Sequence, residues 1–347
     1  MKKLMKEACT LLAEGEDLVL VTVCGKSGSA PRMAGARMIV RRDGRIAGTI
    51  GGGLMEGVAI QDAKKAFSHK QSLSKKFDLS NDDAAITDMI CGGNMEIYLE
   101  HIPADAENLA LFTTLLTALD KGRRLTLVSR LTGKGPTDHA FLMDDKGQLS
   151  EGLVPDSLLA AVKKVRSSTS SPTVISHDNV DYLISYFSIA GELFLIGAGH
   201  VAACTAEAAA RVGFRVIVID DREEFASQER FPTSDEVRVI PHFANCFNDY
   251  AVNHDSYLVI VTRGHMHDYE VLKQALATEA GYVGMIGSRK KRDTIYNSLL
   301  ANGTSQAQID RCHSPIGLPI EADTPEEIAV SIVAELIQQR ARGRSRG

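Results

Sequence analysis

ELFLIGAGHVAACTAEAAARVGFRVIVIDDR, residues 192–222, carries the strongest structural signal in this chain. Its apolar segment 193–196 predicts a buried strand, and GAGHVA at 197–202 forms a G-x-G-x-x-A turn. An alanine-rich helix is predicted over 201–212 and a second apolar strand over 215–219. Strand, turn, helix and strand in this order and at this spacing are typical of a dinucleotide-binding βαβ unit.

Each small residue of the turn has a physical role in such a unit. Gly197 permits the tight turn, Gly199 lets the backbone approach a phosphate, and Ala202 lets helix and strand pack closely. His200 opens the helix, and Asp220, 23 residues after Gly197, is placed to accept the hydroxyl groups of a ribose. Such folds also hold other phosphorylated ligands, so the ligand stays open between a dinucleotide and another phosphate compound.

Length and charge limit the possible classes of protein. The 347 residues are enough for two domains, and 39 basic against 44 acidic residues give a net charge of −5, which disfavours a general binder of nucleic acid or membrane surfaces. No apolar run reaches the roughly 18 residues of a membrane span, and Glu7, Glu14 and Glu16 interrupt the start too early for a secretory signal. We therefore expect a cytoplasmic protein whose six cysteines, with no C-x-x-C pair, are reduced.

The chain predicts two α/β domains. Residues 1–190 are expected to form a mixed α/β domain, and residues 191–347 a Rossmann-like domain with a parallel sheet, with the boundary near Gly191. In the first domain, Asp-Gly at 43–44 predicts a hairpin between strands at 36–41 and 45–50.

A triple glycine, Gly51, Gly52 and Gly53, follows this hairpin and precedes a predicted helix over 54–67. Three unencumbered N–H groups at a helix N-terminus could hold an anion, although a tight strand-to-helix junction is the commoner use of such a stretch. Glu56 in the first helical turn suits the helix dipole. It weakens the anion interpretation unless it acts as an acid, a base or a hydrogen-bond partner.

In the second domain, predicted strands at 256–261 and 282–286 each run into a polar loop that opens a helix. These loops should lie with the glycine turn at the carboxyl edge of a parallel sheet, where open α/β sheets bind ligands. The candidate binding residues in them are Arg263, His265, Ser288 and Arg289. Their positive charge suits a phosphate, although the basic run 289–292 could equally be a solvated helix face.

Two further features have competing interpretations. His265-x-His267-Asp268 looks like part of a metal site, but hydrogen-bonded histidines at a helix start are favoured because no H-E-x-x-H motif supports zinc. Cys91 stands directly before two glycines, where a thiol is either exposed at a backbone bend or buried as a small apolar residue. Of the six cysteines, it is the candidate for chemistry.

Eight segments together resemble the XdhC/CoxI family of accessory factors, which mature molybdenum hydroxylases such as xanthine dehydrogenase and carbon monoxide dehydrogenase. They occur in both domains and leave the middle, about 105–190, unmatched. The segments are GSAPRMAGARMIV (28–40), GTIGGGLMEG (48–57), CGGNMEIYLE (91–100), LFLIGAGHVA (193–202), VIDDREEFAS (218–227), VTRGHMHD (261–268), YVGMIGSRKKR (282–292) and SPIGLPIEADTPEEIAVSIVAELI (314–337).

The resemblance implies a chaperone that binds molybdenum cofactor, as molybdopterin or its dinucleotide form, during sulfuration and passes it to an apo molybdenum hydroxylase. The glycine loops 51–53 and 197–199 could then cradle phosphate, and Arg32 and Arg37 could meet the phosphate or the oxo groups. Cys91 could ligate molybdenum or carry sulfur as a persulfide. A cysteine desulfurase is an expected partner, and a homodimer is expected because such hydroxylases are often dimeric.

Two other functions remain open. An NAD(P)-dependent oxidoreductase would use Asp220 to select NAD and His265 or His267 as proton donor. A scaffold that joins the desulfurase to the hydroxylase would need no ligand in the Rossmann-like pocket. Direct purine oxidation is disfavoured, because the chain lacks the cysteine spacings of iron–sulfur clusters.

Overall fold

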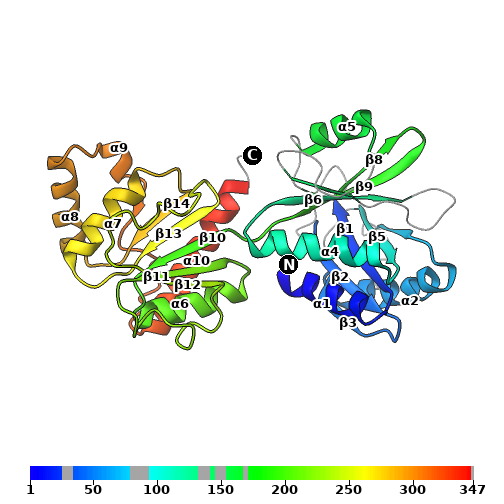
Figure 1. Cartoon of the computed structure of the whole chain (residues 1–347), viewed down its shortest axis with the longest axis horizontal. Coiled ribbons are helices and arrows are strands. Elements are labelled where there is room, and N and C mark those ends of the chain that lie inside the picture. Colours follow the sequence, from blue (N-terminus) through cyan, green and yellow to red (C-terminus); the bar gives the residue numbers. More distant parts are fainter. Residues whose placement is uncertain (26–33, 79–93, 132–140, 145–153, 167–170, 345–347) are drawn as a thin grey trace. The chain divides into compact units, whose positions relative to one another are not determined.

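The computed structural model describes residues 1–25, 34–78, 94–131, 141–144, 154–166 and 171–344. The chain packs into two compact units, Met1–Ser188 and Ile189–Gly347, and Figure 1 labels most of their helices and strands. The elements of the first unit are α1 (Lys2–Ala13), β1 (Leu18–Gly25), β2 (Arg37–Arg41), β3 (Ile46–Thr49), α2 (Gly53–His69), β4 (Leu73–Asp78), β5 (Asn94–Ile102), α4 (Ala106–Asp120), β6 (Leu125–Arg130), β7 (Phe141–Met143), α5 (Asp156–Arg166), β8 (Thr173–His177) and β9 (Val180–Phe187).

The described residues of the first unit form two antiparallel sheets. One has the strand order β3-β2-β1-β5-β4 and the other β7-β6-β9-β8. Alternate residues of β1, including Val19, Val21 and Val23, pack with α2 on one face of the first sheet, because side chains alternate across a strand. On the opposite face, Cys24 and Tyr98 pack with Leu183 of β9, so the two sheets share a buried layer. The hairpin predicted around Asp43 and Gly44 is confirmed by the pairing of β2 with β3.

The second unit is a doubly wound α/β fold. Its elements are β10 (Glu192–Ile196), α6 (His200–Arg211), β11 (Arg215–Asp220), β12 (Glu236–Val239), β13 (Ser256–Ile260), α7 (His265–Leu276), β14 (Tyr282–Met285), α8 (Arg289–Ala301), α9 (Gln306–Ile309), β15 (Cys312–His313) and α10 (Pro325–Arg344). All six strands are parallel, in the order β12-β11-β10-β13-β14-β15. This is the strand order of the Rossmann fold, so the predicted fold class is confirmed.

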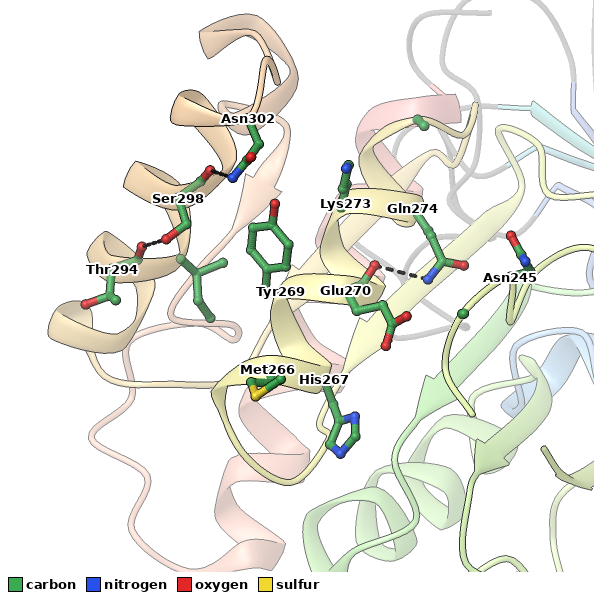
Figure 2. A pocket seen from close by; sticks show the side chains of 13 residues that line it. Asn245, Met266, His267, Tyr269, Glu270, Lys273, Gln274, Thr294, Ser298 and Asn302 are labelled. Carbon is green, nitrogen blue, oxygen red and sulfur yellow. Dashed lines mark hydrogen bonds between the residues drawn. The ribbon is translucent and has the colours of Figure 1, made fainter. Parts of the chain in front are cut away.

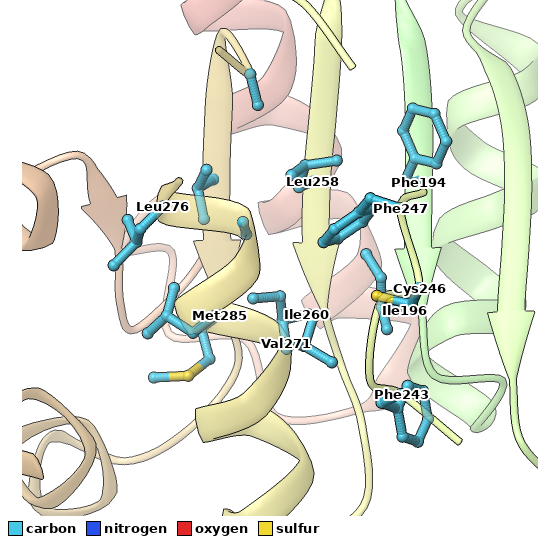
Figure 3. Close-up of a cluster of buried hydrophobic side chains, with 14 of the residues drawn as sticks. Phe194, Ile196, Phe243, Cys246, Phe247, Leu258, Ile260, Val271, Leu276 and Met285 are labelled. Atoms are coloured by element: carbon cyan, nitrogen blue, oxygen red, sulfur yellow. The ribbon is translucent and has the colours of Figure 1, made fainter. Parts of the chain in front are cut away.

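The two faces of the parallel sheet are covered by different helices. Leu193 and Leu195 of β10 pack with the small residues of α6 and with α10. Phe194 and Ile196 point to the other face, where α7 and α8 complete the core shown in Figure 3. The continuous apolar strand therefore reflects burial on both sides, as expected for a parallel sheet.

Two elements of this unit were not expected from the sequence, namely the one-turn helix α9 and the two-residue strand β15. Neither is long enough to show a periodic apolar pattern. Helix α10 begins with a capping box, because the Thr324 hydroxyl oxygen accepts from Glu327 N at 3.2 Å and Thr324 N donates to Glu327 Oε2 at 3.1 Å.

Candidate functional site

The carboxyl edge of the parallel sheet brings together the loops that follow β10, β11, β13 and β14. The connection from β10 leads to β11 on one side, whereas β13 pairs with β10 on the other side. The two halves of the sheet thus diverge at β10 and β13, and this topological switch point is where doubly wound sheets open a ligand crevice. The glycine turn lies at this point.

Gly197 and Gly199 have different roles in that turn. Gly197 has φ +111°, and a Cβ atom on it would lie 2.4 Å from the carbonyl oxygen of Val261. Gly199 has φ −77° and nothing within 4 Å of the position of a Cβ atom. Helix α6 then begins at the exposed His200 without a side-chain cap, so backbone N–H groups of its first turn remain available to an anion. Gly197 builds the turn, and Gly199 leaves it open.

Asp220, the predicted ribose acceptor, is 1% exposed and bonded within the chain. Its Oδ2 accepts from Ala198 N at 2.7 Å and from Arg222 Nη2 at 3.0 Å. Its Oδ1 accepts from Arg222 N at 3.0 Å and Nε at 2.9 Å. Burial acts to raise the pKa of Asp220, but the hydrogen bonds from Arg222 and Ala198 outweigh it and hold the pKa below its ordinary value.

The loop after β13 contributes Arg263 and leads into α7. Arg263 is half exposed and pairs with Asp221 at 3.0 Å, which places it beside the end of β11. Helix α7 begins at His265, whose side chain lies outside the described residues. His267 packs against Phe243 with ring centroids 5.0 Å apart.

A buried polar contact links the starts of α7 and α8. Asp268 has no exposed surface, its Oδ1 accepts from the Thr262 hydroxyl at 2.5 Å, and its Oδ2 pairs with Lys291. Ser288 caps α8 by accepting from Lys291 N at 3.3 Å, and Arg289 follows it on the exposed surface. Of the predicted basic residues in this part of the edge, Lys291 is thus internal, whereas Arg289 faces solvent.

The triple-glycine loop of the first unit holds the carboxylate of its own helix. Glu56 Oε1 accepts from Ile50 N at 3.1 Å, from Gly52 N at 2.9 Å and from the Thr49 hydroxyl. The Thr49 bond and the loop amides lower the pKa of Glu56. Gly51, Gly52 and Gly53 have φ values of +124°, +78° and +60°, which only glycine adopts without strain. Of the roles that the sequence allowed for Glu56, the structure shows that of a hydrogen-bond partner. Its carboxylate is the anion that occupies the triple-glycine loop.

Of the predicted site residues Arg32, Arg37 and Cys91 in the first unit, the structure describes Arg37. Arg37 is buried, its Nη1 and Nη2 donate to the carbonyl oxygens of Gly35 and Tyr186 at 3.3 and 3.1 Å, and it stacks 4.0 Å from the Phe187 ring centroid. Burial lowers the pKa of Arg37 to about 10. The other two residues, Arg32 and Cys91, lie outside the described residues.

The sequence did not indicate a pocket of about 1020 Å³ between α7 and α8 (Figure 2). Met266, on its rim, is 84% exposed, and Gln274 is fixed in its wall by donating to the Phe243 and Glu270 carbonyl oxygens at 2.9 and 3.0 Å. A spacing of three to four residues along each helix is the signal that could have indicated it. Its lining residues are Ala244, Asn245, Met266, His267, Tyr269, Glu270, Lys273, Gln274, Ala277, Thr294, Ile295, Ser298 and Asn302.

The five cysteines within the described residues are unpaired, and all five have raised thiol pKa values. Burial raises the pKa of Cys24 and of Cys246 to about 12 and that of Cys312 to about 11. Because the thiolate is the nucleophile and the metal ligand, burial disfavours sulfur or metal chemistry at Cys24, Cys246 and Cys312.

Of the predicted metal fragment at the start of α7, the structure describes the side chains of His267 and Asp268. Among the side chains that the structure describes, no group of three His, Cys, Asp or Glu is placed to hold a metal ion. Asp268, which the sequence set beside two histidines, is instead bonded to Thr262 and Lys291. Over the same residues, no helix has the length and apolar character needed to cross a membrane.

Two protein-family models match parts of this chain. Residues 193–336 match the XdhC Rossmann domain, and residues 11–78 match the XdhC and CoxI family. The first match covers the strands, the glycine turn and the Asp220 pairing described above. The chain belongs to the XdhC and CoxI family.

The similarity to known proteins extends over almost the whole chain. A protein of Bacillus subtilis (strain 168), named as a probable subunit of xanthine dehydrogenase, is 27% identical over 96% of this chain and 96% of its own length. The Escherichia coli (strain K12) molybdenum cofactor insertion chaperone PaoD is 22% identical over 98% of this chain and 88% of its own. A crystal structure from Bacillus halodurans, described as a xanthine dehydrogenase, has a TM-score of 0.71 and 26% identity, covering 98% of this chain and 96% of the other.

Proposed function

We propose that this protein is a chaperone that binds molybdenum cofactor as its cargo, supports sulfuration of the cofactor and inserts it into a xanthine dehydrogenase-type hydroxylase. The observation that carries the proposal is the likeness, over 98% of the chain, to a relative named as a molybdenum cofactor insertion chaperone. The likeness over 96% of the chain to a relative whose name refers to xanthine dehydrogenase supports the choice of client.

The geometry favours one of the two glycine loops for the phosphate of the cargo. At the triple glycine, Glu56 already accepts the N–H groups of Ile50 and Gly52, so a phosphate would have to displace a carboxylate. At the other loop, Gly199 is open and α6 begins without a side-chain cap. In this proposal the first turn of α6 binds the phosphate, because its N–H groups and the helix dipole favour an anion.

The molybdenum end of the cargo needs a soft ligand or a sulfur carrier. The pKa values of Cys24, Cys246 and Cys312 are raised by burial, which makes these thiols poor candidates. Cys91 therefore stays the proposed ligand or persulfide carrier. In this proposal a cysteine desulfurase supplies the sulfur. The protein acts in the cytoplasm as a homodimer, which would match a dimeric client.

The test is anaerobic binding of molybdenum cofactor to the purified protein, followed by gel filtration and metal analysis. The unchanged protein should retain close to one molybdenum per chain and reconstitute an apo-hydroxylase. Gly199→Asp should lose most binding, because it places a negative charge where the phosphate would sit. Cys91→Ala should lose sulfurated cofactor and client activation.

Gly57→Asp is the matched control. Gly57 lies in α2, is exposed, and also has nothing within 4 Å of a Cβ atom, so the same substitution should leave binding unchanged. Cofactor binding that is absent in the unchanged protein contradicts the proposed function. Equal binding by Gly199→Asp and the unchanged protein contradicts the phosphate site, and full client activation by Cys91→Ala contradicts the role of Cys91.

A further inference from the structure

The C-terminal unit has the strand order and glycine turn with which many α/β proteins bind NAD(P). In such sites the acidic residue that ends the second strand accepts the ribose hydroxyl groups, or a nearby arginine accepts the 2′-phosphate of NADP. Asp220 has this position, because it is the last residue of β11. A dinucleotide bound in the usual way therefore needs free oxygens on Asp220 or a free cation beside it.

Asp220 has no free oxygen. A carboxylate offers about four lone-pair positions, and Asp220 accepts four hydrogen bonds, two on each oxygen. One comes from Ala198 N inside the glycine turn, and three come from Arg222. With 1% of its surface exposed, Asp220 also cannot be reached by a ribose without displacing Arg222.

Arg222 is itself held in place. Its guanidinium group lies 3.7 Å from the centroid of the Phe225 ring, and 18% of its side chain is exposed. Phe225 packs against the core between the sheet, α6 and α10. The guanidinium fork engages both oxygens of Asp220, the strongest geometry for such a pair. Displacement of Arg222 would break this pair and its stacking together.

The surroundings also disfavour the 2′-phosphate of NADP. Arg222 is committed to Asp220, Arg263 is paired with Asp221 at 3.0 Å, and Arg230 lies over the Phe225 ring, 4.7 Å from its centroid. Glu223 and Glu224 follow on the exposed surface, so an added phosphate would meet further negative charge.

We infer that the Asp220 corner, formed by Asp220, Arg222 and Phe225, is closed to nucleosides, and that the Rossmann unit excludes NAD(H) and NADP(H). Asp220 acts here as a positioning residue that ties the end of β11 to the glycine turn. The first turn of α6, which has no side-chain cap, stays open beside this closed corner.

Fluorescence titration of the full chain with NADH and with NADPH tests this inference. The unchanged protein should show no saturable binding up to about 1 mM of either. Arg222→Gly and Arg222→Gln free the oxygens of Asp220, so NADH binding should become saturable. Its dissociation constant should lie at least about tenfold below the 1 mM limit. Adding Asp220→Asn to either variant should abolish that gain. Arg211→Gln, which removes an exposed arginine of α6, is the matched control and should bind no NADH.

Circular dichroism and thermal unfolding establish that each variant is folded. Saturable binding of NADH or NADPH by the unchanged protein overturns the inference, and this measurement requires no variant. If both folded Arg222 variants still fail to bind NADH, Arg222 is not what closes the corner. Because no molybdenum cofactor enters this experiment, its failure leaves the proposed function untouched.

Discussion

Lys291 pairs with Asp268, a carboxylate with no exposed surface, and so joins the first turn of α8 to the first turn of α7. The methylene groups of Lys291 also lie over Gly287, where a Cβ atom would come within 2.8 Å of Lys291 Cδ. The contact connects two of the loops at the carboxyl edge of the sheet. Because the charge of Lys291 is paired with Asp268, Lys291 stabilises this edge of the sheet and does not bind a ligand there.

Lys291→Met should therefore destabilise the protein strongly. It keeps the length of the side chain but leaves the Asp268 charge buried and unpaired, which costs about 3 kcal/mol in unfolding free energy. Denaturant unfolding measures this change. Lys290→Met, at the exposed neighbouring position, should change the unfolding free energy by less than about 0.5 kcal/mol. Equal effects of the two substitutions would refute the buried pair.

The two glycines of the G-x-G turn should respond differently to alanine. Gly197→Ala places a Cβ atom 2.4 Å from the Val261 carbonyl oxygen at φ +111°, so we expect a loss of at least about 2 kcal/mol. Gly199→Ala meets neither obstacle and should be nearly neutral for stability. Thermal unfolding of the two variants side by side compares them. A neutral Gly197→Ala would contradict the close approach of β10 and β13.

Glu56 should make stability depend on pH in the acid range. The Thr49 hydroxyl and the loop amides lower the pKa of Glu56 below its ordinary value of 4.5, so its contribution is complete above pH 4.5. This contribution is lost as pH falls through the lowered pKa, because the protonated carboxyl group is a weaker acceptor.

Glu56→Gln isolates this contribution. Its unfolding free energy should be lower than that of the unchanged protein at pH 7, and the two values should converge towards pH 3. Glu14→Gln, at an exposed position after α1, is the control. Its unfolding free energy should change with pH in the same way as that of the unchanged protein. A constant difference between Glu56→Gln and the unchanged protein over this range would argue against the carboxylate as loop anchor.

Thiol labelling of the native protein should separate Cys91 from the buried cysteines. With a pKa of about 12, Cys24 and Cys246 are thiolate to only about one part in 10⁴ at pH 8, and burial further limits access to them. We expect iodoacetamide to modify Cys91 before Cys24 and Cys246, as mapped by peptide mass spectrometry. Labelling of Cys24 or Cys246 before Cys91 would reverse the proposed assignment. After denaturation the cysteines should react with iodoacetamide at equal rates, and these rates provide the reference.

Much of the fold follows from local pattern. The apolar strand at 193–196, the glycine turn and the helix after it are recognisable because each element repeats its own period. Strand β15, with two residues, has no period and forms because it pairs with β14. The pocket between α7 and α8 was missed for a related reason. The sequence contains the spacing of lining residues along each helix, but the distance between the two helices is set by packing.

The sequence by itself determined the order of the elements, the glycine turn, the position of Asp220 at the end of β11 and the nearness of Glu56 to three glycines. Only the tertiary structure decided what these groups bind. Asp220 is bonded by Ala198, 22 residues earlier in the chain, and Asp268 pairs with Lys291 from the next helix. Local propensity depends on neighbouring residues, whereas a hydrogen bond depends on the positions of two atoms after packing. That difference is why both a filled and an open anion cradle can share the same glycine-rich signature.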